Sequence, residues 1–200
     1  MPLNSRYDEQ AVVQAIALSL ETFYTTLIEK IDRLNIQKVM KRKNPYLYRA
    51  KAMQSASEIV DSVLTAFVSS SEETIFGNCF FEPIAIAASG GNKALAEGID
   101  IMLQDDENNT IYAIAVKSGP SVFNADSKKR QEQNFVAASK LAQQVKARYE
   151  AYIGYCYGRK SDSGRGKPKM YQELAGKRFW AELTGDEEFY IKIIDYMGTM

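Results

Sequence analysis

The pattern of apolar and polar residues in the middle of the chain predicts a β-hairpin. Two apolar, β-rich runs, Gly98–Leu103 and Thr110–Lys117, flank an acidic, Asn-rich turn at Asp105–Asn109. Asp100 lies near the start of the first strand, so the hairpin can bring its carboxylate beside the ammonium group of Lys117. Ionisable groups at the ends of apolar strands are costly unless they are paired or bind a metal. This pair is therefore either an ordinary ion pair or the start of a functional site.

Apolar residues at steps of three and four over residues 7–34 predict one long N-terminal helix, which either packs on the core or pairs with a second subunit. Ser55 with Glu58, and Ser70 with Glu73, form capping-box patterns that predict two further helix starts. Additional helices are predicted over residues 46–53, 127–148, 177–183 and 187–196, and a strand over residues 151–157.

Pro83 is expected to bend or end the helix that begins at Ser70. The run Ile84–Ser89, directly after it, fits either the last turns of that helix or the first strand of the sheet. We find no internal repeat and no linker that would split the chain.

Composition limits the possible chemistry. The chain has 200 residues, of which 46% are hydrophobic and 25% charged, and this suits one globular domain. It has no histidine, which excludes His-based triads, His–metal sites and ββα-metal nucleases. Two cysteines form no ligand cluster, no apolar run approaches the roughly 18 residues of a membrane span, and there is no secretory signal. We therefore expect a cytoplasmic protein outside the membrane.

The basic residues are clustered although the net charge is zero. Lys128–Arg130 lie near the start of the predicted helix 127–148, where positive charge is unfavourable, and this hints at an anionic partner. The glycine-rich, basic segment 158–169 either orders on DNA or is a flexible surface loop. Each cluster is either a solvated face or a set of phosphate contacts. The candidate DNA-binding residues are Lys128, Lys129, Arg130, Arg159, Lys160 and Arg165.

Gly98-Ile99-Asp100, followed by Ala115-Val116-Lys117, resembles the signature of the PD-(D/E)xK nuclease superfamily. Longer segments are similar to type II restriction endonucleases of the PmeII-like kind. These segments are K-N-P-Y-L-Y-R-A-K (Lys43–Lys51), S-S-E-E-T-I-F-G (Ser70–Gly77), A-V-K-S-G-P (Ala115–Pro120) and Y-C-Y-G-R (Tyr155–Arg159).

The resemblance implies an α/β fold with a restriction-endonuclease-like core, in which helices flank a central mixed β-sheet, plus a long N-terminal helix and additional helices. It implies one domain, with a helical extension at residues 1–69, the nuclease core at 70–157, and a basic loop and C-terminal helices at 158–200. It also implies Mg²⁺ as cofactor, with Mn²⁺ as substitute, double-stranded DNA as substrate, and a homodimer that cuts both strands.

Ala115 departs from the superfamily pattern, which has an acidic residue or glutamine at this position. The resemblance then implies that Asp100, the backbone carbonyl of Val116 and a relocated carboxylate bind the metal, while Lys117 acts on the attacking water or the phosphate. We rank the relocated acid as Glu73, then Glu97, then Glu132. Glu82 is an alternative to Glu73, which could instead only cap its helix, and Glu132 could simply face solvent.

Three functions remain open from the sequence. The first is an active type II restriction endonuclease. The second is a catalytically silent DNA-binding or regulatory protein on the nuclease fold, which Ala115 suggests. The third is a nuclease of the same fold that acts in repair or defence without strict sequence specificity.

Overall fold

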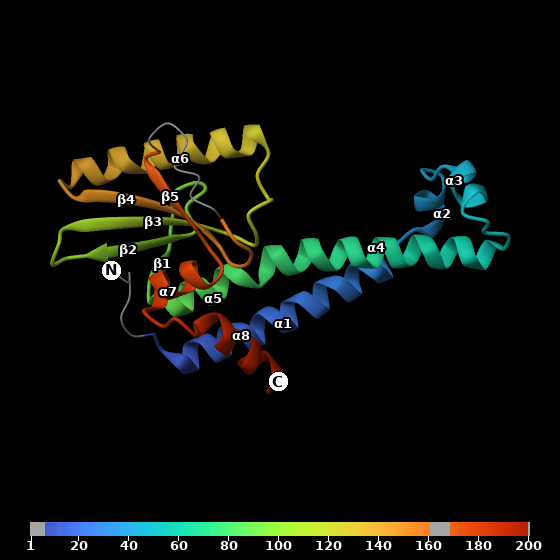
Figure 1. Ribbon diagram of the computed structural model, residues 1–200, viewed down its shortest axis with the longest axis horizontal. Helices are drawn as coiled ribbons and strands as arrows, with labels where there is room; N and C mark the ends of the chain where they lie inside the picture. Colours follow the sequence, from blue (N-terminus) through green and yellow to red (C-terminus); the bar gives the residue numbers. More distant parts are fainter. Residues whose placement is uncertain (1–6, 161–168, 200) are drawn as a thin grey trace. The chain divides into compact units, whose positions relative to one another are not determined.

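The computed structural model describes residues 7–160 and 169–199 (Figure 1). The chain separates into two compact units. The sheet unit comprises Met1–Ser19 and Phe80–Met200, and the helical unit comprises Leu20–Cys79. Helix α1 (Glu9–Asp32) contributes residues to both units and is the predicted long N-terminal helix. The predicted subdivision of one domain at residues 69 and 157 stays a prediction.

A five-stranded sheet in the order β1-β2-β3-β4-β5 forms the centre of the sheet unit. The β1–β2 and β2–β3 pairs are antiparallel, whereas the β3–β4 and β4–β5 pairs are parallel. The predicted hairpin is confirmed as β2 and β3, with Ile101 opposite Ile114. The sequence patterns did not predict β1 or β5. The strands are β1 (Asn92–Lys93), β2 (Ile101–Asp105), β3 (Thr110–Lys117), β4 (Arg148–Tyr155) and β5 (Tyr171–Ala175).

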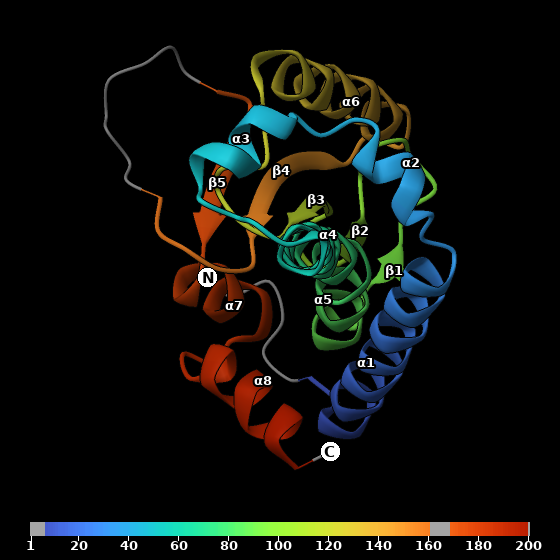
Figure 2. The same ribbon diagram turned by 90° about the vertical axis from the view of Figure 1, so that its right-hand side faces the viewer.

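Helices cover both faces of the sheet, as Figures 1 and 2 show. Helix α6 (Ala125–Gln144) lies on one face, where its Phe135 packs into an apolar cluster with Ala115 and Ile153. Helices α5 (Phe81–Ser89) and α7 (Lys177–Thr184) lie on the other face. There a Cβ on Gly154 would lie 2.0 Å from the ring of Phe179, so glycine allows α7 to approach β4. The predicted α/β class, with a mixed sheet flanked by helices, is confirmed.

The two helices predicted at the C-terminus are present as α7 and α8 (Phe189–Gly198). Trp180 of α7 is buried and its Nε1 donates a hydrogen bond to the Cys156 carbonyl (2.9 Å). Tyr7 Oη donates to Asp186 Oδ2 (3.0 Å), which also accepts from Lys192 Nζ (2.6 Å). These bonds attach the first described residue to the C-terminal helices.

The helical unit is built around α1 and α4 (Ala56–Cys79). Phe23 and Leu27 of α1 pack against Ile75 of α4 and are almost fully buried. Two short helices, α2 (Ile36–Met40) and α3 (Pro45–Ala50), connect them; α3 corresponds to the helix predicted over residues 46–53, whereas α2 was not predicted. An open cavity of about 700 Å³ in this unit is lined in part by basic side chains. These are Lys30, Arg33, Lys38, Arg42 and Lys43.

Helix α4 corrects one prediction. Ser55 and Glu58 make the predicted capping box at its start, since the Ser55 N–H donates to Glu58 Oε2 (3.0 Å) and the Glu58 N–H donates to Ser55 Oγ (3.2 Å). The second capping box, at Ser70 and Glu73, is wrong because α4 continues through both residues to Cys79. Inside a helix the backbone N–H groups already bond to carbonyls one turn earlier, so no unbonded N–H remains there to be capped.

Two further predictions concern helix ends. Pro83 lies in the first turn of α5, where a missing N–H costs little, and α4 ends at Cys79, four residues before it, so the expected interruption of the helix is present. Helix α6 starts at Ala125 rather than at residue 127, with Asn124 as its N-cap and Asp126 in the first turn. Lys128 therefore lies past the first turn, which removes the helix-dipole argument for an anionic partner.

Helix α1 is long and apolar enough to cross a membrane by length and composition, although its apolar residues are interrupted by polar ones. Buried helices of soluble proteins pass the same test, and 22% of the apolar window is buried here. This finding is weak evidence for a membrane span, and it corrects the expectation that no segment reaches that hydropathy.

Candidate active site

Asp100 and Lys117 meet where β2 begins and β3 ends. The Asp100 N–H donates to the Ile114 carbonyl (2.9 Å), which fixes the backbone just before β2. Asp100 Oδ2 accepts hydrogen bonds from the Val116 N–H (2.6 Å) and from Lys117 Nζ (3.2 Å). Lys117 Nζ also donates to the Val116 carbonyl (2.9 Å). The two charged side chains are 20% and 27% exposed, so the pair is held by the sheet yet open to solvent.

Gly98 shapes the loop that presents Asp100. Its φ of +70° lies in the left-handed region that glycine adopts at little cost. Helix α6 also comes close, because Gln131 Nε2 donates to the Gly98 carbonyl (2.7 Å) and a Cβ at this position would lie 2.1 Å from Asn134 Nδ2. Both the backbone conformation and the space require glycine two residues before the aspartate.

Ala115, which lies two residues before Lys117, is fully buried on the α6 face of the sheet. It packs in the same apolar cluster as Phe135 and Ile153. A carboxylate in this position would be surrounded by apolar groups, and alanine offers no ligand atom in its side chain. Any second acidic ligand must therefore come from another element.

The three ranked candidates for that acid lie in different surroundings. Glu97 is in the loop before β2 and pairs with Arg130 of α6, and both side chains are largely exposed. Glu132 of α6 accepts a hydrogen bond from Tyr171 Oη (3.1 Å). Glu73 lies on the exposed side of α4, in the helical unit. The structure thus gives Glu97 and Glu132 partners other than Asp100.

Glu82, in the first turn of α5, forms an ion pair with a lysine of β1. Its Oε1 pairs with Lys93 Nζ (3.0 Å), and Lys93 lies on β1 opposite Ile101, the residue after Asp100. The hydrogen bond and charge of Glu82 raise the pKa of Lys93, and the charge of Asp100 adds a smaller increase. Lys93 therefore interacts with both carboxylates.

Two oxygen atoms at this edge of the sheet are of the kind that magnesium binds. Within the described ranges, no group of three or more His, Cys, Asp and Glu side chains is arranged to hold a metal. Mg²⁺ requires less, because it commonly binds one or two carboxylates and keeps several waters. Asp100 offers Oδ1, which accepts no hydrogen bond from any residue that the structure describes, and Val116 offers its carbonyl.

Comparison with protein families agrees with this geometry. The family model described as "Type II restriction endonuclease EcoO109I" matches residues 10–200. The chain belongs to this family. No curated protein matches it. As a member of the EcoO109I family, the chain has a type II restriction-endonuclease-like function, which means a nuclease that binds DNA.

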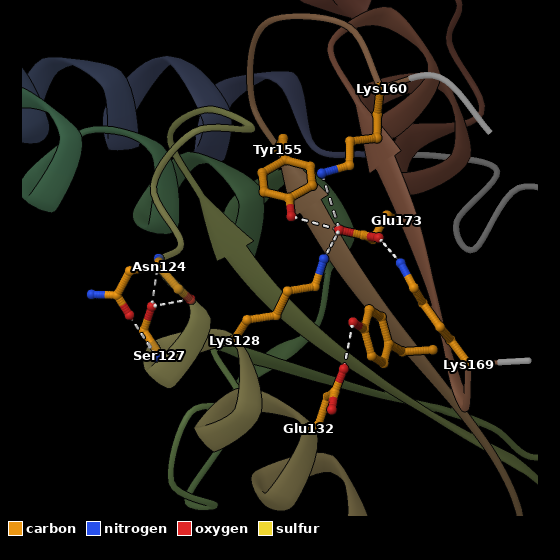
Figure 3. A network of polar contacts seen from close by, with 9 residues as sticks. Asn124, Ser127, Lys128, Glu132, Tyr155, Lys160, Lys169 and Glu173 are labelled. Atoms are coloured by element: carbon orange, nitrogen blue, oxygen red, sulfur yellow. Dashed lines mark hydrogen bonds and ion pairs between the residues drawn. The ribbon is translucent and has the colours of Figure 1, made fainter. Parts of the chain in front are cut away.

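This EcoO109I-family chain gathers lysines around Glu173 of β5 (Figure 3). Glu173 Oε1 lies 3.3 Å from Lys128 Nζ and 3.3 Å from Lys160 Nζ, and it accepts a hydrogen bond from Tyr155 Oη (2.8 Å). Lys169 pairs with Oε2. Burial raises the pKa of Glu173, but the hydrogen bonds from Lys169 and Tyr155, with the charges of Lys128 and Lys160, outweigh it and lower the pKa to about 2. We call Lys128, Lys160 and Lys169 the lysine cluster.

The residues predicted to bind DNA in this restriction endonuclease family member occupy different places. Lys128 and Lys160 belong to the lysine cluster, whereas Lys129 and Arg159 are exposed and Arg165 lies outside the described residues. Sequence reasoning missed Glu173, although the glycine-rich basic segment beside it was noticed. Glu173 lies on β5, and this strand of five residues is too short to show a clear alternation of apolar and polar residues.

Proposed function

We propose that the chain is a Mg²⁺-dependent type II restriction endonuclease of the PD-(D/E)xK superfamily, similar to the PmeII-like kind, that hydrolyses phosphodiester bonds in double-stranded DNA. The observation that carries the proposal is the contact between Asp100 and Lys117 on paired strands, in a chain of which residues 10–200 match the family. Acting on DNA, it would work in the cytoplasm.

Asp100 and the Val116 carbonyl supply oxygen ligands for Mg²⁺, and Mn²⁺ can substitute for it. When bound, the metal neutralises charge on the phosphate and makes water a stronger nucleophile. Lys117 Nζ uses two of its three N–H donors on Asp100 and the Val116 carbonyl. The third donor can reach a phosphate oxygen and stabilise the charge that develops there. In-line attack then leaves a 5′-phosphate and a 3′-hydroxyl.

Glu82 is the acid that we favour, since its ion-pair partner Lys93 lies on β1 opposite Ile101, the residue after Asp100. Glu73, which ranks first from the sequence, and then Glu97 and Glu132 remain candidates, because a metal ion could draw an exposed carboxylate away from its present partner. With Glu82 added, the donors are two carboxylates and a carbonyl, which is within the range usual for Mg²⁺.

A second candidate function is a catalytically silent DNA-binding or regulatory protein on the same fold. The buried Ala115 favours it, because this position supplies no ligand. A third candidate is a nuclease of repair or defence that cuts without strict sequence specificity. DNA cleavage separates these functions directly.

The test is incubation of the purified protein with plasmid DNA and Mg²⁺ or Mn²⁺. We expect discrete fragments from the parent, none after the metal is removed with a chelator, and a loss of about 100-fold or more in rate for both Asp100→Ala and Lys117→Ala. Lys140→Ala, at an exposed lysine on α6 that is not a DNA-binding candidate, serves as a control for general loss of positive charge.

Each other result points to a different function. A smear in place of discrete fragments would support the non-specific nuclease. DNA binding without cleavage would support the silent binding protein, and absence of both binding and cleavage would reject all three functions.

A further inference from the structure

Three ammonium groups converge on one buried carboxylate in the sheet unit. The side chain of Glu173 is 7% exposed, whereas those of Lys128, Lys160 and Lys169 are 32%, 29% and 45% exposed. Lys128 comes from α6, and Lys160 and Lys169 come from the two sides of the segment 161–168. Glu173 is therefore the common partner of lysines that are far apart in the sequence (Figure 3).

The charges in this network do not balance. Among the described residues, these ion pairs place three ammonium groups on one carboxylate, so their charges sum to an excess of positive charge. Glu132 lies nearby, but its carboxylate accepts a hydrogen bond from Tyr171 Oη and contacts none of the three lysines. Like charges held close together repel each other, and partial burial weakens the screening by water. An anion beside the lysine cluster would remove this cost.

Aromatic rings hold two of the lysines in place. Lys160 Nζ lies 5.0 Å from the centre of the Tyr155 ring, and Lys169 Nζ lies 5.5 Å from the centre of the Tyr171 ring. Both are cation–π distances. Burial, followed by the hydrogen bond to Glu173, raises the pKa of Tyr155, so its hydroxyl remains a donor to the carboxylate. The ammonium groups are thus placed before any ligand binds.

The lysine cluster lies at the same end of the sheet as the Asp100–Lys117 pair. Lys117 pairs in register with Tyr155 across the parallel strands β3 and β4, and Tyr155 Oη reaches Glu173 on β5. Glu173 itself is in register with Ile153, so two strand spacings of about 10 Å and an offset of two residues, about 7 Å, separate it from Lys117. Because phosphates recur every few ångströms along a DNA strand, one strand can contact both places at once.

We propose that Glu173 is a positioning residue that gathers the lysine cluster into a preformed site for a backbone phosphate of the DNA, next to the phosphate that is cleaved. This inference rests on the proposed function and adds a second phosphate site to it. Each ammonium group has three N–H donors and uses one on Glu173, so donors remain on all three lysines for phosphate oxygens. Pre-placed lysines lose less side-chain entropy on binding.

Glu173→Gln removes one negative charge, and the direction of the resulting change in DNA affinity distinguishes two roles for Glu173. If Glu173 were only one more negative charge near the DNA, its removal would strengthen binding. If Glu173 positions the lysines, its removal weakens binding although the protein becomes more positive. The two roles thus predict opposite changes in affinity.

The experiment measures binding of a fluorescent DNA duplex in chelator, at several salt concentrations, so that no cleavage occurs. We expect Glu173→Gln to bind about 10-fold more weakly than the parent. We also expect the slope of log K against log salt to fall by about one, as for loss of one phosphate contact. Lys160→Gln should reduce the slope in the same way.

Two further variants show whether a change in DNA affinity comes from the position of Glu173 or only from the loss of a carboxylate. Glu187→Gln removes a carboxylate from an exposed ion pair with Lys177 and should leave the affinity unchanged or slightly raised. Tyr155→Phe keeps the ring below Lys160 and removes only the hydroxyl, so it should weaken binding less than Glu173→Gln while preserving the fold. Circular dichroism checks the fold of each variant.

Equal or tighter binding by folded Glu173→Gln, with an unchanged salt slope, would overturn the positioning role and leave the proposed function intact. If Glu173→Gln does not fold, Tyr155→Phe decides in the same way. Failure of the parent to bind DNA at all would instead overturn the proposed function, and the second phosphate site with it.

Discussion

Glu82 is a candidate for the acidic metal ligand that Ala115 cannot supply. Its partner Lys93 lies on β1 opposite Ile101, the residue after Asp100, so we expect Glu82 to be near a metal ion bound at Asp100. We predict that Glu82→Gln lowers the cleavage rate by about 100-fold or more, because the metal loses one of its charged ligands. The measurement is the rate of plasmid cleavage in Mg²⁺.

Lys93→Gln is the matched control for this prediction, since it breaks the same ion pair and leaves the carboxylate in place. It should retain most of the activity. Equal losses in both variants would mean that only the ion pair matters. If Glu82→Gln cleaves as fast as the parent, then Glu73→Gln, Glu97→Gln and Glu132→Gln identify the ligand instead.

Gly98 is a second residue whose role is set by its immediate surroundings. We predict that Gly98→Ala lowers the free energy of unfolding by about 1 to 3 kcal/mol, because alanine is strained at a φ of +70° and its Cβ meets Asn134. Urea unfolding measures this difference. The control is Gly198→Ala near the C-terminus, where an added Cβ meets nothing within 4 Å and stability should change little.

How far the sequence predicts the site depends on the kind of residue. Asp100 and Lys117 stand out because charged residues are rare on apolar strands that a short turn joins. Glu173 does not stand out, because its lysine partners come from separate segments and only the fold brings them together. Sequence patterns therefore reveal a contact across a short hairpin, and they do not reveal contacts between distant segments.

At the level of elements, the sequence predicts the long helices α1 and α6 and the hairpin well. The hairpin is specified locally, by alternation on both strands and by the turn between them. Strand β5 has five residues and pairs only with β4, in parallel, so its partner is distant in the sequence. A short strand of this kind is defined by its neighbour in the sheet more than by its own residues.

Helix α4 shows the opposite error, because the sequence contains a helix-start pattern that tertiary packing outweighs. Ser70 and Glu73 have the spacing of a capping box, yet buried residues before and after them lie on one continuous helix face. Val63, Ser71 and Ile75 form that face, and their burial stabilises the helix across the serines. Tertiary packing outweighs a capping preference of about 1 kcal/mol.

At the level of the whole molecule, the proposed cleavage of both DNA strands requires two active sites, which a two-fold symmetric homodimer provides. Within the helical unit, α1 carries a second apolar stripe besides the buried one. Tyr24 and Ile28 are each 58% exposed, and Ile31 is 37% exposed. Their spacing of four and three residues places them on one side of the helix. We propose that this stripe packs against the same stripe of a second copy.

We predict that the parent is a dimer and that Ile28→Glu is a monomer, because a charge on each copy would be buried against its counterpart at the two-fold axis. Sedimentation equilibrium measures the mass of both. Thr22→Glu adds the same charge at an exposed polar position on the side of the helix away from the stripe and should remain dimeric. A monomeric parent that still cuts both strands would contradict the symmetric arrangement. A dimeric Ile28→Glu would instead place the dimer contact on another surface, and it would leave the exposed stripe of α1 without this role.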